Sequence, residues 1–131
     1  MKIVLDTDII IYFLKGNEKI SKKLLSFPPN DIYTTIFNIT EMLYGAYNSK
    51  KIEYNLKLIK DFAKNINILH FNEEASEIFA KNKAQLKQEG KLIADFDLLI
   101  ASIAIVNNCI LITNNIRHFK RIKTLQVENW I

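Results

Sequence analysis

Two aspartates interrupt an apolar stretch at the start of the chain. Residues 2–14 read KIVLDTDIIIYFL, so Asp6 and Asp8 stand between two runs of large apolar residues. A carboxylate buried without a partner destabilises a fold by several kcal/mol. We therefore expect a strand over 2–6 that ends at Asp6, followed by a helix over 8–15. Asp8 is expected to be the N-cap of that helix, because a helix-starting aspartate commonly accepts hydrogen bonds from free backbone N–H groups.

The rest of the chain alternates between strand-like and helix-like patterns. Short β-branched runs are separated by longer segments whose apolar residues recur at helical spacing. This alternation predicts an α/β fold in three layers, a central mostly parallel sheet of about four to five strands flanked by helices on both faces. The expected strands are 2–6, 32–35, 66–71, 109–113 and 125–127, and the expected helices are 8–15, 18–27, 36–48, 51–65, 73–89, 95–108 and 115–121.

Length and charge narrow the kinds of protein that this chain can be. With 131 residues, 49% of them apolar, it fits one domain, residues 1–131, with its own core. Its formal charge of +4 favours a polyanionic partner. Its one cysteine, Cys109, is expected to be a buried apolar residue of a protein in a reducing compartment. No signal peptide or membrane-length apolar run is visible, which predicts a cytoplasmic protein without a membrane partner.

Three further acids lie in apolar surroundings. Glu41 is inside the helical segment FNITEMLYGAY with Gly45 one turn later, and Asp95 and Asp97 open the segment DFDLLIAS. A glycine inside a helix is costly, so we expect something near that face of the helix to need the room. Residues two apart on a helix point about 200° away from each other. We expect Asp95 to be the N-cap and Asp97 to lie in the first turn, where the helix dipole favours its ionised form.

The predicted topology brings polar side chains to one edge of the sheet. Asp6 ends the first strand, and Thr113, Asn114 and Asn115 follow the 109–113 strand. Ligands of parallel sheets bind outside the carboxyl ends of the strands. A site at this edge is therefore expected.

A convergence of Asp6, Glu41 and Asp97 at that edge creates a strongly acidic pocket. Each carboxylate raises the pKa of its neighbours, and a divalent cation removes the conflict. Oxygen ligands without histidine or cysteine favour Mg²⁺, with Mn²⁺ as a substitute, over Zn²⁺. His70 and His118 have no zinc-site spacing and are expected to be structural or surface residues. A Mg²⁺ site beside a basic surface suits phosphodiester hydrolysis by a metal-activated water.

Other enzyme classes remain open at this point. The LDTD motif after a first strand also resembles the start of a haloacid-dehalogenase-type phosphatase, in which the first Asp is a nucleophile. The chain is short for that fold, and its later acid pair opens a buried helix. A receiver domain is less favoured, because no acid ends the strand INILHF.

A family resemblance is carried by four stretches, IVLDTDIIIYFL, ITEMLYGAYNSKK, ADFDLLIASIAIVNNCILITNNIRHFKRI and the terminal VENWI. Together they resemble the PIN-domain toxin ribonucleases of the VapC branch of type II toxin–antitoxin (VapBC) modules. The resemblance implies a PIN-like α/β fold and Mg²⁺-dependent cleavage of RNA, with a structured RNA such as a tRNA as target. It also implies a homodimer, a VapB-type antitoxin that blocks the site, and contact with DNA only through the antitoxin complex.

The resemblance assigns Asp6, Glu41 and Asp97 as the metal-binding and catalytic acids, with Asp95 as the rival of Asp97. Many family members carry a further acid just after the threonine of the fourth strand, where this chain has Asn115. This departure removes one charge and puts a second metal ion in question, although Asn115 can still offer a carbonyl oxygen. It also motivates an alternative function, a PIN scaffold that binds RNA or a protein partner without cutting.

Supporting roles follow from the same resemblance. Thr7, Thr113 and Asn114 are expected to hydrogen-bond the acids. Arg117 and Arg121, with lysines around the cleft, are expected to hold the RNA backbone. The dimer surface is expected on the second and third helical segments.

Overall fold

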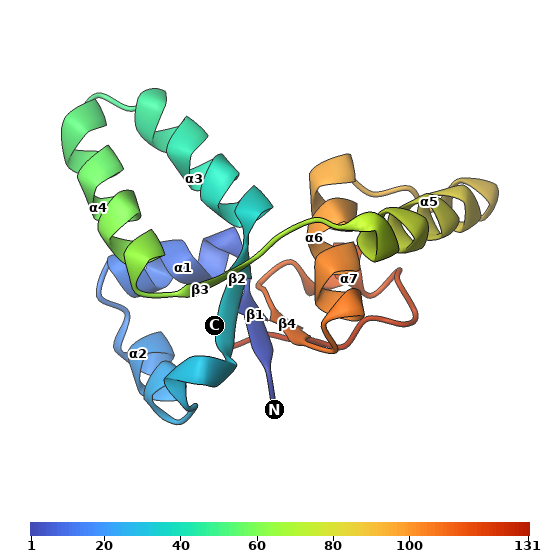
Figure 1. Ribbon diagram of the computed structural model, residues 1–131, viewed down its shortest axis with the longest axis horizontal. Coiled ribbons are helices and arrows are strands. Elements are labelled where there is room, and N and C mark those ends of the chain that lie inside the picture. Colours follow the sequence, from blue (N-terminus) through green and yellow to red (C-terminus); the bar gives the residue numbers. More distant parts are fainter.

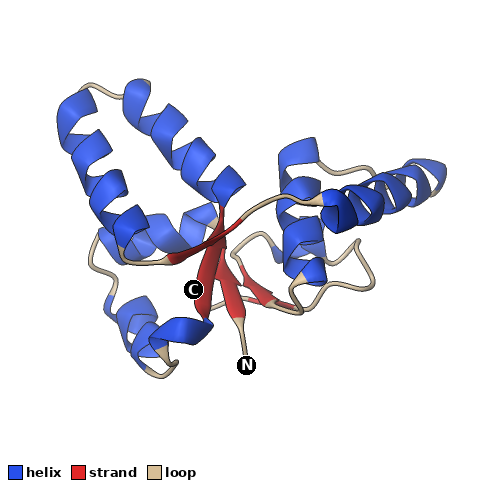
Figure 2. Ribbon diagram, viewed as in Figure 1, coloured by secondary structure: helices blue, strands red, loops and turns tan.

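The computed structural model describes residues 1–131 and places a five-stranded sheet between two groups of helices (Figures 1 and 2). The strands are β1 (Ile3–Leu5), β2 (Ile32–Thr35), β3 (Asn67–Leu69), β4 (Ile110–Ile112) and β5 (Val127–Glu128). The helices are α1 (Thr7–Leu14), α2 (Glu18–Leu25), α3 (Ile36–Tyr47), α4 (Ile52–Lys64), α5 (Glu73–Gln88), α6 (Asp95–Val106) and α7 (Ile116–Phe119), with a short 3₁₀ turn, η1 (Pro29–Asp31), before β2. Every expected element is present, and each lies within two residues of its expected ends.

The order of the strands puts β1 at the centre of the sheet. The order is β3-β2-β1-β4-β5, and every neighbouring pair is parallel. The chain moves outward from β1 through β2 to β3, then crosses back to β4 and continues outward to β5. The direction of winding therefore reverses between β1 and β4, the position where open α/β sheets bind their ligands. The predicted α/β fold with a parallel sheet is confirmed.

Alternating side chains of β1 divide the core into two layers. Ile3 and Leu5 pack with buried residues of α1, α2, α3 and α4, whereas Val4 packs with those of α5, α6 and α7. Successive residues of a strand point to opposite faces of the sheet, so the apolar run of β1 serves both layers. Figure 2 shows the sheet enclosed in this way.

The apolar segment after Asp97 forms the predicted buried helix. Ala101 and Ala104 of α6 are fully buried at 0% exposure, and their small side chains let the helix approach the sheet closely. Cys109 is also buried, as expected, and burial raises the pKa of its thiol. None of the helices combines the length and the hydrophobicity that a membrane crossing requires.

Two predicted helix caps are wrong. Helix α1 begins one residue early, so Asp6 is its N-cap and accepts a hydrogen bond from the Thr7 N–H, while Asp8 lies in the first turn. The N-cap position of α6 is held by Ala94, and Asp95 lies inside the helix without a capping bond. In both places the acid that was expected to be the cap lies one or two residues after the true N-cap, and its side chain makes tertiary contacts that are described below.

Candidate active site

Asp6 lies at the centre of the polar edge of the sheet, where β1 meets α1. Its carboxylate is only 7% exposed, yet both oxygens are hydrogen-bonded. Oδ1 accepts from the Thr7 backbone N–H at 2.9 Å and from Asn38 Nδ2 at 3.0 Å, and Oδ2 accepts from Thr113 Oγ1 at 2.7 Å. Three donors from three segments thus compensate for the burial of this acid.

Glu41 is tied to Asp6 through a chain of hydrogen bonds. Asn38 Nδ2 also donates to Thr7 Oγ1 at 3.0 Å, and Thr7 Oγ1 donates to Glu41 Oε1 at 2.9 Å. Glu41 and Asn38 both belong to α3, so this helix presents an amide and a carboxylate to the end of β1. The predicted support of the acids by Thr7 and Thr113 is present in these contacts.

Asn38 is a site residue that the sequence analysis missed. It is completely buried, and its Oδ1 accepts a hydrogen bond from Thr35 Oγ1 at 2.7 Å. The Thr35 N–H donates to Asn38 Oδ1 at 3.3 Å and the Asn38 N–H donates to Thr35 Oγ1 at 3.2 Å, and these two bonds form a capping box at the start of α3. The signal in the sequence was the pair of polar residues three apart at a helix start, TIFN, which indicates such a box. The box orients Asn38 toward Asp6.

Asp97 faces the same edge from the first turn of α6, as predicted. Its Oδ2 lies 3.9 Å from Nδ1 of His118. Partial burial and the nearby charge of Asp6 raise the pKa of Asp97, and His118 partly opposes this effect. His118 is therefore at the rim of the acidic site, a position that its lack of zinc-type spacing did not indicate.

Asp8 is the fourth acid of this edge, not the helix cap that was predicted. Its Oδ1 accepts from the Ile9 N–H at 2.7 Å, and its Oδ2 accepts from the Asn114 N–H at 3.0 Å. Burial, with repulsion from Asp6 and Asp97, raises the pKa of Asp8 to about 6. The expected contribution of Asn114 to the acids is made by its backbone, which lies 106 positions further along the chain.

The four acids share one electrostatic environment. Burial raises the pKa of Glu41 as well, and the charges of Asp6, Asp97 and Asp8 add to the effect. Mutual repulsion among carboxylates at one edge favours a bound cation. No three acid or histidine side chains are already closed into a metal cage. Mg²⁺ does not need one, because it keeps several of its waters and is commonly held by one or two carboxylates.

Asp95 does not belong to this group. Its Oδ1 forms an ion pair with Lys83 Nζ of α5 at 2.9 Å, and 60% of its side chain is exposed. Asp95 is also absent from the charges that raise the pKa values of Asp8, Glu41 and Asp97. The structure therefore favours Asp97 over Asp95 as the acid of α6.

The remaining candidate residues lie around β4 and α7. Asn115 donates its backbone N–H to Thr113 Oγ1 at 3.0 Å, and its Nδ2 lies 3.0 Å from Nδ1 of His118. Arg121 donates from Nη1 to the backbone oxygen of Leu92 at 2.9 Å, which ties the segment after α7 to the segment before α6. Arg117 is exposed on α7. The predicted roles of both arginines in holding RNA stay predictions.

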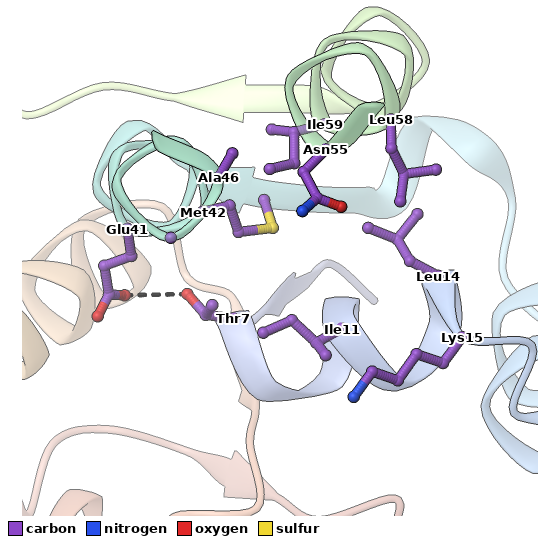
Figure 3. A pocket seen from close by; sticks show the side chains of 11 residues that line it. Thr7, Ile11, Leu14, Lys15, Glu41, Met42, Ala46, Asn55, Leu58 and Ile59 are labelled. Carbon is purple, nitrogen blue, oxygen red and sulfur yellow. Dashed lines mark hydrogen bonds between the residues drawn. The ribbon is translucent and has the colours of Figure 1, made fainter. Parts of the chain in front are cut away.

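A mainly apolar cavity of about 260 Å³ adjoins the acids on the side of α1, α3 and α4 (Figure 3). Thr7 and Glu41 form one end of it, and Asn55 and Lys15 add the other polar groups. Gly45 lines the cavity, and nothing lies within 4 Å of the place where its Cβ would be. The expectation that something near this face of the helix needs the room is therefore wrong for the chain itself, because a Cβ at Gly45 would meet no neighbouring atom.

Comparison with known proteins gives one consistent family. Residues 3–125 match the PIN domain family. Ribonuclease VapC2 of Haemophilus influenzae is 33% identical over 131 residues, which covers 100% of this chain and 99% of that protein. The tRNA(fMet)-specific endonuclease VapC of Shigella flexneri is 29% identical over 130 residues, with 99% and 98% covered.

Solved structures give the same result. A chain of VapBC2 from Rickettsia felis, bound to a DNA fragment from their promoter, superposes with a TM-score of 0.93 at 34% identity, and 100% of each chain is covered. A chain of VapBC-1 from nontypeable Haemophilus influenzae gives a TM-score of 0.91 at 33% identity, with 99% and 98% covered. The alternatives of a dehalogenase-type phosphatase and a receiver domain are displaced by these full-length matches.

Proposed function

Since this chain belongs to the PIN-domain family, in its VapC ribonuclease branch, we propose that it hydrolyses RNA phosphodiester bonds with a Mg²⁺ ion held at the acidic edge. The observation that carries the proposal is the gathering of Asp6, Asp8, Glu41 and Asp97 at the winding reversal of the sheet, where neighbouring charges add to the raised pKa values of three of them. A cluster of carboxylates of this kind has the donor chemistry of a hard-cation site.

Some residues of the site would bind the ion, and others hold those ligands in position. Asp6 and Asp97 would hold Mg²⁺, and the donors Thr113 and Asn38 keep the Asp6 carboxylate fixed in position. When bound, the ion lowers the pKa of a coordinated water and neutralises charge that develops on the phosphoryl group. Glu41 accepts one hydrogen bond from Thr7 through Oε1, so Oε2 is free to orient the attacking water and to take its proton.

Asp8 has a further role in this proposal. The chain has Asn115 where many relatives place an additional acid, and Asp8 supplies a fourth carboxylate to the same edge through a different element. A PIN scaffold that does not cleave RNA is the second candidate, and Asn115 alone favours it. The carboxylate of Asp8 offsets part of the charge that an acid at position 115 would add.

Partners are proposed from the relatives. Similar proteins are found in VapBC complexes bound to promoter DNA, and some similar proteins are named for tRNA(fMet) cleavage. We infer a VapB-type antitoxin that covers the site and carries the DNA contact, a homodimeric toxin, and a tRNA as the natural substrate. Arg117 and the surface lysines are the candidates for phosphate contacts.

The test is RNA cleavage by the purified chain with Mg²⁺, with EDTA and with Asp6→Asn. Asp61→Asn, at an exposed position on α4, is the matched control. We expect cleavage with Mg²⁺ and a loss of at least about 100-fold for EDTA and Asp6→Asn, the size found when one electrostatic contact to a transition state is removed. Calorimetric titration with Mg²⁺ measures the site independently of activity. Activity that survives both changes would refute the metal assignment, and metal binding without cleavage of tRNA would favour the scaffold.

A further inference from the structure

Three phenylalanine rings form a cluster beside the acids, where α3, α6 and the segment after β3 meet. The ring centroid of Phe37 lies 5.5 Å from that of Phe96 at an interplanar angle of 64°, and 5.8 Å from that of Phe71 at 71°. Both contacts have the edge-to-face geometry that aromatic pairs prefer, so each ring fixes the orientation of the next.

Two rings of the cluster are carried by the same two helices as the acids Glu41 and Asp97 of the proposed function. Phe37 and Glu41 are one turn apart on the same face of α3, and Phe96 immediately precedes Asp97 in the first turn of α6. Helices α3 and α6 contact each other at this edge. The Phe37–Phe96 pair therefore lies along the same seam between the helices as Glu41 and Asp97.

Phe96 is the outermost ring of the three. It remains 36% exposed, whereas Phe37 and Phe71 are partly buried and Leu98, two residues later on α6, is 1% exposed. Packing of α6 on the sheet thus does not require the Phe96 side chain. An exposed ring held in one orientation by a second ring is a preorganised surface for another flat aromatic group, and it loses little conformational freedom when such a group binds.

We propose that Phe96 is a stacking platform for an unpaired RNA base next to the phosphate that is cut, and that it makes the site prefer single-stranded RNA segments. The inference rests on the proposed ribonuclease function, since the base reaches Phe96 only when the backbone lies at Asp97. Bases stack on exposed aromatic rings in single-strand-binding sites without a strong sequence preference. A base inside a duplex is already stacked on both faces and cannot reach the ring.

The experiment compares Phe96→Leu and Phe96→Tyr with the wild-type protein. Leucine keeps much of the apolar contact with Phe37 but has no π face, and tyrosine keeps the ring. Tyr54→Leu, at a position that is 67% exposed on α4, is the matched control for loss of a surface ring. Two RNA probes are used, a fluorescein-labelled 12-nucleotide strand without secondary structure and a hairpin that holds the same sequence in its stem.

Affinity is measured by fluorescence anisotropy with Ca²⁺ in place of Mg²⁺, and kcat and KM are measured with Mg²⁺. Phe96→Leu is expected to weaken binding of the single strand by roughly 5- to 100-fold and to leave binding of the hairpin and the melting temperature nearly unchanged. Phe96→Tyr should restore affinity, and Tyr54→Leu should have no effect. The loss should fall mainly on KM, because the base is held in both the ground state and the transition state.

The proposal is overturned if Phe96→Leu binds the single strand with the affinity of the wild type, or if its affinity falls equally for both probes. It is also overturned if the substitution changes the oligomeric state, because Phe96 would then belong to a subunit interface. If the protein binds single strands through Phe96 but cuts no RNA, the stacking site stands and the ribonuclease function is refuted. If the Phe96→Leu variant cuts single strands with unchanged KM, the ribonuclease function stands and the stacking site is refuted.

Discussion

Replacing Asp8 with asparagine should change the stability of the metal-free protein in a pH-dependent way. Burial and the charges of Asp6 and Asp97 raise the pKa of Asp8 from its ordinary value of 3.8 to about 6 in the folded state. A raised pKa means that the fold disfavours the ionised form. The wild-type protein therefore keeps its full stability below about pH 4 and loses part of it as the pH rises through 6, whereas the variant has no charge to lose there.

The size of this effect follows from the change in pKa. A rise from 3.8 to about 6 corresponds to about 3 kcal/mol, at about 1.4 kcal/mol for each pH unit. Asp8 is partly exposed, so solvent screens its charge, and we expect a measurable part of about 1 to 1.5 kcal/mol. Asparagine also loses one of the two hydrogen bonds that Asp8 accepts from Ile9 and Asn114. Both bonds favour the ionised form, and their effect is already contained in the raised pKa of about 6, so they are not counted a second time.

The assay is urea unfolding in EDTA at about pH 4 and about pH 7.5, followed by the fluorescence of Trp130, the only tryptophan and 2% exposed. All samples have the same protein concentration, because a dimer would make stability concentration-dependent. From the lower to the higher pH, the free energy of unfolding of Asp8→Asn should rise by about 1 to 1.5 kcal/mol relative to that of the wild type. Asp61→Asn is the control for removal of an exposed charge. An unchanged difference between Asp8→Asn and wild type at the two pH values would refute the shared acidic environment of the site.

Two further substitutions test how the acids are placed. Thr113→Val removes the 2.7 Å hydrogen bond to Asp6 Oδ2 and should lower the free energy of unfolding by about 1 to 3 kcal/mol, with a roughly 10- to 100-fold loss of Mg²⁺ affinity by calorimetry. Equal affinity in wild type and variant would show that Thr113 does not position Asp6. Asp95→Asn removes a largely exposed ion pair with Lys83 and should cost less than about 1 kcal/mol, with unchanged Mg²⁺ affinity and RNA cleavage. A loss comparable to that of Asp97→Asn would make Asp95 a metal ligand.

The sequence alone determined the order and type of every element and the edge of the sheet where the site lies. The β-branched run that ends at Asp6 and the apolar helix that follows Asp97 are local patterns, and each reports which face of its element is buried. The carboxyl ends of parallel strands lie at one edge of a sheet, and the structure adds that β1 and β4 are neighbours there. Asp6 and Thr113 could be placed at one edge by that reasoning. The convergence of Glu41 and Asp97 on it was a hypothesis, and the role of Thr7 followed from the family resemblance.

Only the tertiary structure decided what each side chain does at that edge. Asp8 and Asp95 both resembled helix caps, but the backbone N–H of Asn114 engages the first and Lys83 engages the second, from elements far away in the chain. Asn38 became a support of Asp6 because α3 packs beside β1, and Phe96 became an exposed ring because α6 meets α3 at Phe37. The physical reason is the distance along the chain over which each kind of interaction acts. Hydrophobic periodicity depends on neighbours within a few residues, whereas the partner of a polar or aromatic side chain depends on which remote segment the fold brings within hydrogen-bonding or van der Waals distance of it.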